Sequence, residues 1–593
     1  MNIKNQALII VFLLLVMSVG FGFVENREII EKTRFNVSDY GAFPNDGKDD
    51  TESLRTAVAL ARAKTGSILF FPPGRYLISD SLAIKIQNDA LSGKLGKNPQ
   101  NQLFVPNKEY VIGLDLLGAN NLEIQAKDVH LICDGWMEPL SFRNAQNIIL
   151  NGITIDYKRR PNNEGEIIKL GDDFVDVKFQ QDEILAKNQI VLRIMIYDKI
   201  KKSFSGAGVY QKRMEWIDKH TIRFYGDGIR NQAKIGDILI TYSGFHYRPA
   251  ILIYKTKNIV LNDVTINSQA GMGIVGHLNQ NITMNRLKVV PAKGRHVSTN
   301  TDATHFSTNR GLIRFDDCEF GGQGDDATNV HTYYTHILNN DPSKKQCDIA
   351  VDRKNYTHSS YLDEPMDNDV MAIVKKSTLE EVGYVKVRRF WPHPLQDKVT
   401  IQYDGKLPKK TDDYYLINIS TTPKLEFVNC IVRSHRARSV LVKTRKVLIK
   451  DNHFENTTGT AIHVGTEGDW GEGPASEDVV IENNEFINCG LGGPEDGTMD
   501  GASAIALHVK APTTNTSGLH KRILMQGNTI SGGKHAIAVK GSAEVTIRNN
   551  EFTNISQNPI MIGASVRVKA YKNIGGDPIG KDEKDPILPN LIY

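Results

Sequence analysis

Three aspartates in two short polar motifs are the first candidates for chemistry in this sequence. Asp302 ends the motif Asn300-Thr-Asp302, and Asp325 and Asp326 follow 23 and 24 residues later in Gly324-Asp-Asp326. Three carboxyl groups held close together cannot all ionise freely, so at least one pKa is expected to rise and its group to stay protonated near neutral pH. A protonated carboxyl beside ionised ones suits glycoside hydrolysis, in which one group protonates the leaving oxygen while another activates water.

The spacing of these aspartates has two other interpretations. Aspartates at a constant interval can stack as a ladder of turns, and clustered carboxylates can bind Ca²⁺. Three further polar residues in the same two segments, His305, Gln323 and His331, favour catalysis and are candidate substrate-binding residues.

Two other segments carry side chains suited to sugar binding. Arg436 and Arg438 lie 13 residues beyond the start of a strand-like repeat, as Asp325 does, so they are expected on the next coil. They could contact substrate, orient the carboxylates or only balance charge. The segment Gly465–Gly473 holds Glu467, Asp469 and Trp470, a mix of carboxylates and an aromatic plate that suits sugar recognition. A metal-binding loop or a plain acidic turn is the alternative.

A repeated phrase of short apolar runs between asparagines indicates how these residues are positioned. It occurs at Asn147–Asn151, Asn258–Asn262 and Asn281–Asn285, and later copies begin at Leu312, Leu425, Val447, Val479, Ile523, Val545 and Val566. Several intervals fall at 21 to 23 residues, which is typical of stacked β coils whose apolar faces bury one another. Neighbouring strands of such a stack lie about 4.8 Å apart. The repeat therefore predicts that Asp302 and Asp325 meet on adjacent coils.

Two long segments interrupt the repeat. Residues 157–249 and 333–422 contain runs of alternating polar and apolar residues, which predict antiparallel β insertions, in the form of small barrels. The second insertion follows the Asp325-Asp326 strand directly and is expected to form a wall of the site. The predicted organisation is a signal peptide (1–22), the first part of the β-helix (33–156), insertion 1 (157–249), the catalytic coils (250–332), insertion 2 (333–422), the last part of the β-helix (423–575) and a loosely packed tail (576–593).

Composition excludes several classes of protein. The 593 residues include 72 basic and 68 acidic ones, and this near balance is no footprint of a nucleic-acid-binding protein. Lys4 followed by the apolar run 7–19 predicts a signal peptide and export to the periplasm or the cell exterior, with an uncleaved anchor as the alternative. That run is too short for stable insertion in a membrane. Five scattered cysteines form no CxxC pair, and no cofactor or metal ion is predicted. The oligomeric state stays open.

The opening of the chain resembles a known entry module. The segment Phe35–Asp50, a predicted helix over 51–64 and the segment Gly66–Ile78 are similar to the start of the pectate-lyase-like superfamily, in which a helix caps the first coil. The resemblance implies an all-β fold: a right-handed parallel β-helix with an N-terminal capping helix, here with the two antiparallel β insertions.

The aspartate motifs resemble two families of that superfamily. Asn300-Thr-Asp302 and Gly324-Asp-Asp326 are similar to motifs of polygalacturonases, glycoside hydrolase family 28, but that family's Gly-His-Gly and Arg-Ile-Lys motifs are absent. The longer string TDATHFSTNRGLIRFDDCEFGGQGDDATNVH, residues 301–331, resembles glycoside hydrolase family 110 more closely, and the similarity extends over the whole mature chain.

The family 110 resemblance implies an exo-acting, inverting α-1,3-galactosidase. It implies that Asp325 is the general acid and that Asp302 and Asp326 are the bases that hold and deprotonate the attacking water. The implied substrates are galactose-terminated oligosaccharides or glycoconjugates, including blood-group-B-type glycans and linear Galα1-3Gal. A polygalacturonase-like hydrolase and a non-catalytic glycan-binding β-helix are the alternatives, and the role of a fucose branch stays open.

Overall fold

The computed structural model describes residues 32–96, 109–181, 183, 185, 188–206, 208–244, 246–350, 364–393, 396–491, 503–513, 518–580 and 584–591. The predicted signal peptide, 1–22, lies outside these described residues. The chain divides into Met1–Thr33 and Arg34–Tyr593, and the second unit holds the features below. Within the described part of the chain, no helix has the length and apolar character needed to cross a membrane.

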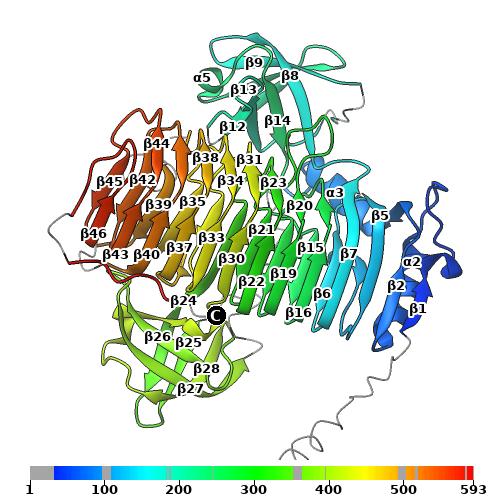
Figure 1. Cartoon of the computed structure of the whole chain (residues 1–593). Coiled ribbons are helices and arrows are strands. Elements are labelled where there is room, and N and C mark those ends of the chain that lie inside the picture. The colour runs from blue at the N-terminus through cyan, green and yellow to red at the C-terminus, as the bar shows by residue number, and fades with distance from the viewer. Residues whose placement is uncertain are drawn as a thin grey trace, which may run out of the picture. The chain divides into compact units, whose positions relative to one another are not determined.

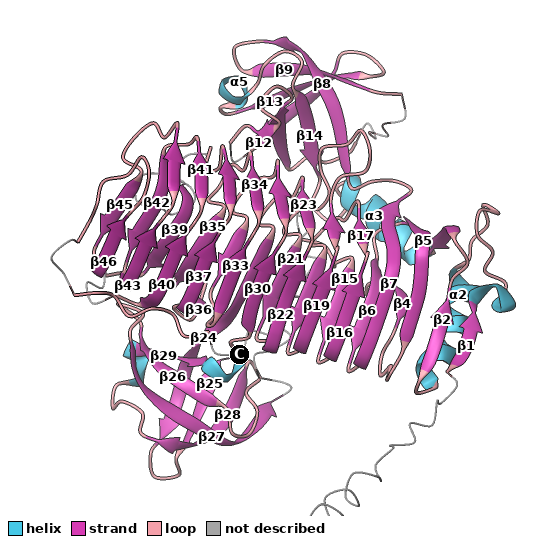
Figure 2. Cartoon of the chain, viewed as in Figure 1, coloured by secondary structure: helices cyan, strands magenta, loops and turns pink. Residues whose placement is uncertain are grey.

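Parallel strands stacked in three rows form the body of the second unit (Figures 1 and 2). The first row consists of β2 (Ser67–Phe70), β5 (Glu123–Asp134), β7 (Gln146–Tyr157), β16 (Lys257–Asn262), β19 (Gln280–Asn285), β22 (Arg310–Asp316), β30 (Lys424–Val428), β33 (Val447–Lys450), β37 (Glu477–Glu482), β40 (His520–Gln526), β43 (Ser542–Arg548) and β46 (Val566–Tyr571). The strand β1 (Thr33–Asn36) pairs with β2.

The other two rows complete each coil. The second row joins β3 (Gly74–Ser79) and the later halves of β5 and β7 to β17 (Thr265–Ile266), β20 (Lys288–Val289), β23 (Glu319–Gly321), β31 (Ile431–Arg433), β34 (His453–Glu455), β38 (Glu485–Ile487), β41 (Thr529–Ser531) and β44 (Glu551–Thr553). The third consists of β4 (Ile112–Asp115), β6 (Glu138–Arg143), β15 (Ile251–Tyr254), β18 (Ile274–His277), β21 (Thr304–Ser307), β24 (Thr328–Asp341), β32 (Val440–Val442), β35 (Ile462–Glu467), β39 (Ser503–Lys510), β42 (His535–Lys540) and β45 (Ile560–Gly563). The predicted parallel β-helix is confirmed.

The register of the first row shows how well the repeat predicted the coils. Ile259 pairs with Ile282, Leu425 with Val447, and Ile523 with Val545, as their intervals predicted. Two expected starts were wrong by one or two residues, because Ile313 rather than Leu312 pairs with Leu425, and Val568 rather than Val566 pairs with Val545. A one-residue shift matters, since alternate residues of a strand point to opposite faces.

Aromatic side chains stack along the inside of the coils. Phe427 lies 6.3 Å from Phe454, and Phe454 lies 5.0 Å from Phe486, measured between ring centroids, with nearly parallel rings. All three side chains are completely buried. Because each ring covers the next, the apolar faces of successive coils form one continuous core.

A ladder of buried asparagines satisfies the turns between the first and second rows. Its members, in chain order, are Asn452, Asn484, Asn528, Asn550 and Asn573. Each of the first four donates its side-chain amide to the side-chain oxygen of the next member, at 2.8–3.0 Å. Asn528 also donates to the carbonyl oxygen of Ile481 and accepts the backbone N–H of Asn484.

The substitution Asn528→Ala is expected to lower the free energy of unfolding by roughly 2–4 kcal/mol. It removes four side-chain hydrogen bonds, each worth about 1 kcal/mol, and leaves buried partners unsatisfied. Urea denaturation followed by circular dichroism measures the change. Asn339→Ala, at an exposed strand position, is the matched control and is expected to change the free energy by less than about 0.5 kcal/mol. Equal effects of the two substitutions would contradict a stabilising ladder.

The predicted capping helix is present at the start of the β-helix. The helix α2 (Thr51–Ala63) buries Leu54, Ala57, Val58 and Ala61 against the first coils, which confirms the expectation for 51–64. Asp50 precedes the helix, but its carboxylate accepts the backbone N–H groups of Phe43 and Leu77 instead of capping the helix. A second helix, α3 (Ser81–Leu91), follows β3.

Both insertions are closed antiparallel barrels. The first consists of β8 (Asn162–Leu170), β9 (Phe174–Phe179), β13 (Thr221–Gly226), β12 (Val209–Trp216), β10 (Arg193–Asp198) and β14 (Ile238–Tyr242), which pairs back to β8. It also holds the short strand β11 (Ser203–Phe204) and the helix α5 (Ile229–Gln232). In the second, β24 pairs with β25 (Gln346–Ala350), followed around the ring by β28 (Lys398–Gly405), β27 (Glu381–His393), β26 (Val370–Lys375) and β29 (Tyr414–Asn418). The predicted antiparallel insertions are confirmed.

The described part of the tail runs back over the last coils. The backbone N–H of Ile587 donates to Glu544 at 2.6 Å, and that of Asn590 donates to Asp478 at 2.9 Å. The side chains of Ile587 and Leu588 remain largely exposed. Backbone hydrogen bonds, and not apolar burial, hold this segment.

Candidate active site

The outer face of the third row positions the candidate catalytic residues. Phe306, Val330 and Val442 point into the core, so their strand neighbours on β21, β24 and β32 point outward. Asp302 directly precedes β21, and Asp325 and Asp326 directly precede β24. The site therefore lies where three parallel strands begin.

The backbone register corrects which aspartates match between coils. Thr304 pairs with Thr328, an interval of 24 residues, so Asp302 is level with Asp326 and not with Asp325. Ala303 donates to the carbonyl oxygen of Asp326, and the next coil brings Arg438, not Arg436, level with Asp326. The expected pairing was wrong by one residue because the catalytic coil is longer than the 23-residue coil before it.

The three carboxyl groups do meet. Oxygen atoms of Asp302, Asp325 and Asp326 lie within 4.8 Å of one another. Burial raises the pKa of Asp302 well above its ordinary value, and the charge of Asp325 adds to this effect. Burial also raises the pKa of Asp326, although the charge of Arg438 opposes the rise. The raised pKa values fall on the two buried aspartates, which the resemblance assigned as bases.

Asp325 differs from the other two because it faces solvent. Its side chain is 35% exposed, against 8% for Asp302 and 6% for Asp326. An Nη atom of Arg436 lies 3.3 Å from its carboxylate and 3.1 Å from the carbonyl oxygen of Gly324. Arg436 thus orients the exposed carboxylate from one side.

The first barrel contributes groups around Asp325. Arg193 on β10, Tyr242 at the end of β14 and His246 after it all interact electrostatically with the Asp325 carboxylate. Burial lowers the pKa of Arg193 to about 10 and that of His246 to about 4. Sequence analysis expected the second insertion to wall the site, whereas these residues come from the first.

A buried chain of alternating charges leads away from Asp326. Arg438 contacts Asp326 at 3.3 Å and Glu467 at 2.9 Å, and Lys443 contacts Glu467 at 2.8 Å and Glu472 at 2.5 Å. Lys443 is completely buried. Burial opposes its charge, but the two glutamates outweigh this effect and raise its pKa. The charges of the chain are therefore compensated inside the protein.

Two histidines connect Asp302 to the far end of the same chain. Nδ1 of His305 lies 2.8 Å from Oδ2 of Asp302, and its Nε2 lies 2.8 Å from Nε2 of His331. His331 also contacts the carbonyl oxygen of Thr332 through Nδ1 at 3.2 Å, and Glu472 lies 3.8 Å from its Nε2. Burial lowers the pKa of His305 to about 4 and that of His331 to about 3, so both rings are neutral near pH 7.

The segment Gly465–Gly473 divides between the site and the surface. It forms the end of β35 and the strand β36 (Glu472–Gly473), which turns back to pair antiparallel with β24. This turn places Glu467 and Glu472 in the buried chain. Asp469 instead pairs with Lys510 at 2.5 Å, and Trp470 is 63% exposed.

Gln323 lies inside the coil, where no substrate reaches it. Its side chain is completely buried and donates to the carbonyl oxygens of Val289 and Gly321 at 2.7 and 2.9 Å. It therefore holds the turn before Asp325 and is not a substrate-binding residue, as sequence analysis had predicted.

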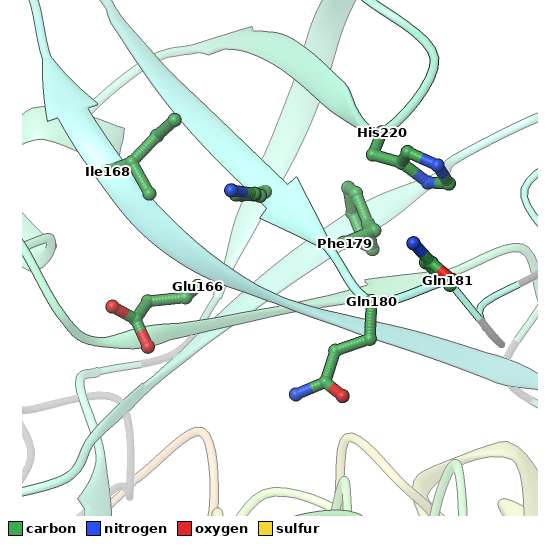
Figure 3. A pocket seen from close by; sticks show the side chains of 7 residues that line it. Glu166, Ile168, Phe179, Gln180, Gln181 and His220 are labelled. Atoms are coloured by element: carbon green, nitrogen blue, oxygen red, sulfur yellow. The ribbon is translucent and has the colours of Figure 1, made fainter.

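A separate hollow of about 890 Å³ lies on the first barrel (Figure 3). Its lining residues are Glu166, Ile168, Lys178, Phe179, Gln180, Gln181 and His220. Glu166 is the one carboxylate among them, so this hollow lacks the several carboxyl groups that glycoside hydrolysis needs.

Comparison with known proteins matches both the entry module and the whole chain. Residues 34–169 match the family described as "Rhamnogalacturonase A/epimerase, pectate lyase-like". An α-1,3-galactosidase A of Bacteroides fragilis is 24% identical over 562 residues, which cover 90% of this chain and 89% of the relative. An α-1,3-galactosidase A of Shewanella woodyi is 25% identical over 510 residues, with 80% and 79% coverage. The chain is a homologue of the α-1,3-galactosidases.

Among solved structures, an exopolygalacturonase of Thermotoga maritima resembles this α-1,3-galactosidase homologue at 11% identity and a TM-score of 0.42. The match covers 92% of each chain.

Several residues of the α-1,3-galactosidase homologue's site were not predicted. Lys443 and Glu472 belong to the buried chain, and Asn329 donates to Glu472 at 3.1 Å. Lys443 had a detectable signal, since it follows the apolar run Val440–Val442 with the alternation of an outward position. The barrel residues Arg193 and His246 had none, because their place depends on how the insertion folds back.

Proposed function

We propose that the protein is an exo-acting α-1,3-galactosidase that releases terminal galactose with inversion of configuration. The observation that carries this proposal is the meeting of Asp302, Asp325 and Asp326 within 4.8 Å in a homologue of the α-1,3-galactosidases. Three adjacent carboxyl groups provide a proton donor and a pair of groups that hold water, which is the chemistry that hydrolysis of a glycosidic bond requires.

The exposure of the three aspartates supports different roles for them. Asp325 faces solvent, from which the substrate enters, and is suited to protonate the leaving oxygen. Asp302 and Asp326 are buried at matching points of adjacent coils and are suited to hold the attacking water between them. The role of Asp325 as acid and of Asp302 and Asp326 as bases is part of the proposal.

Inversion requires room for that water. Inverting hydrolases separate acid and base carboxyl groups by roughly 6.5–9.5 Å, whereas the closest oxygens here lie within 4.8 Å. We infer that the exposed Asp325 side chain turns toward the glycosidic oxygen when substrate binds, which widens its separation from the buried pair.

The charges around the trio favour a neutral sugar over a uronic acid. Arg438 and Lys443 already pair with carboxylates of the protein, and Arg436 pairs with Asp325. A uronate would need a cation that is not already compensated. This is why galactose fits the site better than galacturonate.

The substrate class is tested with three glycans and the purified full chain. We expect release of galactose from linear Galα1-3Gal and from the fucosylated blood-group-B trisaccharide, and no product from polygalacturonate. Comparison of the first two rates measures whether a fucose branch is required or only tolerated. Release of galacturonate, or binding of glycans without any released sugar, would overturn the proposal.

We also propose that the protein is exported, on the basis of the basic residue and apolar run at its N-terminus. Fractionation of expressing bacterial cells, with a variant that lacks residues 1–22 as the control, tests this. Equal amounts of both forms outside the cytoplasm would contradict export through this segment.

A further inference from the structure

The hydrogen bonds of His305 and His331 allow few arrangements of protons. A neutral imidazole has one N–H donor and one acceptor nitrogen. Nδ1 of His331 faces the carbonyl oxygen of Thr332, which only accepts, so the proton of a neutral His331 belongs on Nδ1. Its Nε2 must then accept a hydrogen bond from Nε2 of His305, 2.8 Å away.

The same reasoning fixes the proton on Asp302. Because His305 donates through Nε2, its Nδ1 is an acceptor, and it lies 2.8 Å from Oδ2 of Asp302. A hydrogen bond between them exists only when Asp302 carries the proton. The resting chain is therefore a protonated Asp302, which donates to His305, which donates to His331, which donates to the carbonyl oxygen of Thr332.

This resting state conflicts with the proposed role of Asp302. A base must be ionised to take a proton from water, yet a buried carboxyl beside two others loses its proton with difficulty. We propose that the proton of Asp302 is relayed through His305 to His331, where the carboxylate of Glu472 stabilises the imidazolium. This inference rests on the proposed function and explains how its base is made available.

The relay moves two protons and breaks no other bond. The proton on Oδ2 of Asp302 passes to Nδ1 of His305, while the proton on Nε2 of His305 passes to Nε2 of His331. His331 keeps its Nδ1 proton and becomes a cation, and Asp302 becomes the carboxylate that accepts a proton from water. No protons are gained or lost in total.

The fold positions Glu472 for this task. The strand β36 pairs with β24 so that Glu472 is opposite Tyr333, two residues beyond His331. Lys443 and Asn329 both donate to its Oε2, which leaves Oε1 as the oxygen nearest His331, at 3.8 Å. Glu472 and His331 are therefore positioning residues that act through Asp302.

Other charged and titratable groups surround the relay on each packed element. Asp325, Arg438 and Glu472 act on Asp302, and Glu472, Lys443 and Asp325 act on His305. His331 is influenced by Glu472, His305 and Lys443. Two more buried histidines interact with His305, namely His277 on β18 and His246 from the first barrel. The relay is tested by changing only Glu472 and His331, so that these other groups stay in place.

The test is the pH dependence of kcat/KM on Galα1-3Gal for the wild type and for Glu472→Gln. Without the carboxylate, the His331 cation is no longer stabilised, and Asp302 ionises only by losing its proton to solvent. The fall of kcat/KM at low pH is then expected to move upward by about 1–3 pH units, the size of a nearby-charge effect. His331→Gln, whose amide cannot take up the proton, is expected to shift the profile in the same direction. The double variant should shift it no further than the larger single change.

The matched control is Glu485→Gln. Glu485 contacts His453 at 2.8 Å in an exposed pair on the second row, so the same chemistry is altered away from the site. We expect no shift of the pH profile in this variant.

A loss of activity by one factor at every pH, in both Glu472→Gln and His331→Gln, would show a structural role and overturn the relay. One equivalent of bound zinc whose removal abolishes activity would also overturn it, because a cation would then bridge the two Nε2 atoms. These results are distinct from failure of the proposed function, in which the wild type itself would release no galactose.

Discussion

Asp325→Asn is expected to reduce kcat/KM on Galα1-3Gal by about 10²–10⁴-fold, the usual contribution of a general acid. The same variant should lose far less activity on a dinitrophenyl α-galactoside. A dinitrophenolate leaves without protonation, so a missing acid matters little for that substrate. Comparison of the two substrates therefore isolates the proton-donating role of Asp325.

Asp302→Asn and Asp326→Asn are the matched controls for this experiment. If these residues hold and deprotonate water, both substrates need them equally, and both rates should fall by a similar factor. A selective recovery of Asp302→Asn or Asp326→Asn on the activated substrate, with none for Asp325→Asn, would exchange the proposed roles. Near-normal turnover by Asp325→Asn on Galα1-3Gal would remove it from catalysis.

Lys443→Met is expected to lower the free energy of unfolding by about 3–5 kcal/mol at pH 7. Lys443 is completely buried between Glu467 and Glu472, at 2.8 and 2.5 Å. Its removal leaves buried carboxylates without their main compensating charge, which is the costly way to break a buried ion pair. Denaturation in guanidinium chloride measures the loss, and activity should fall with it because Glu467 also contacts Arg438.

This effect should depend on pH in a defined direction. The pKa of Glu472 lies at about 2 in the folded protein, against an ordinary 4.5; burial opposes this lowering, and His331 and Lys443 cause it. A lowered pKa contributes stability that is present above 4.5 and is lost as the pH falls toward 2. The difference between the wild type and Lys443→Met should therefore be largest above pH 4.5 and shrink below it.

Lys510→Met is the control for Lys443→Met. Lys510 also forms one close ion pair, with Asp469 at 2.5 Å, but both side chains are 47% exposed. Exposed pairs contribute about 0–1 kcal/mol, so this variant should be nearly as stable as the wild type. Equal losses for the two lysines would show that burial of the chain is not what stabilises it.

The fold was predictable because each coil announces itself locally. The phrase Asn258–Asn262 recurs as Asn281–Asn285, and the two segments pair side by side in the structure. The barrels were predictable as antiparallel insertions from alternating residues such as Phe174–Phe179. That each insertion closes into a ring depends on pairings between its first and last strands, such as β8 with β14, which no short segment specifies.

The site was predictable where chemistry and repeat coincide, and not elsewhere. The spacing of Asp302 and Asp325 brought the trio together, but the true partner of Asp302 is Asp326, since one coil differs in length by a residue. Glu472 reaches His331 only because β36 turns back onto β24. Such contacts depend on the path of a loop, and the types of its residues do not reveal that path.

The most direct test of the proposed function is proton NMR of the sugar released from Galα1-3Gal by the purified full chain. We predict that β-galactose appears first and that the α anomer grows in later by mutarotation. This result would establish hydrolysis of an α-1,3-galactoside by single displacement, with water held by the buried aspartates. Initial release of α-galactose would mean retention through a covalent intermediate and would contradict the proposed roles of Asp302, Asp325 and Asp326.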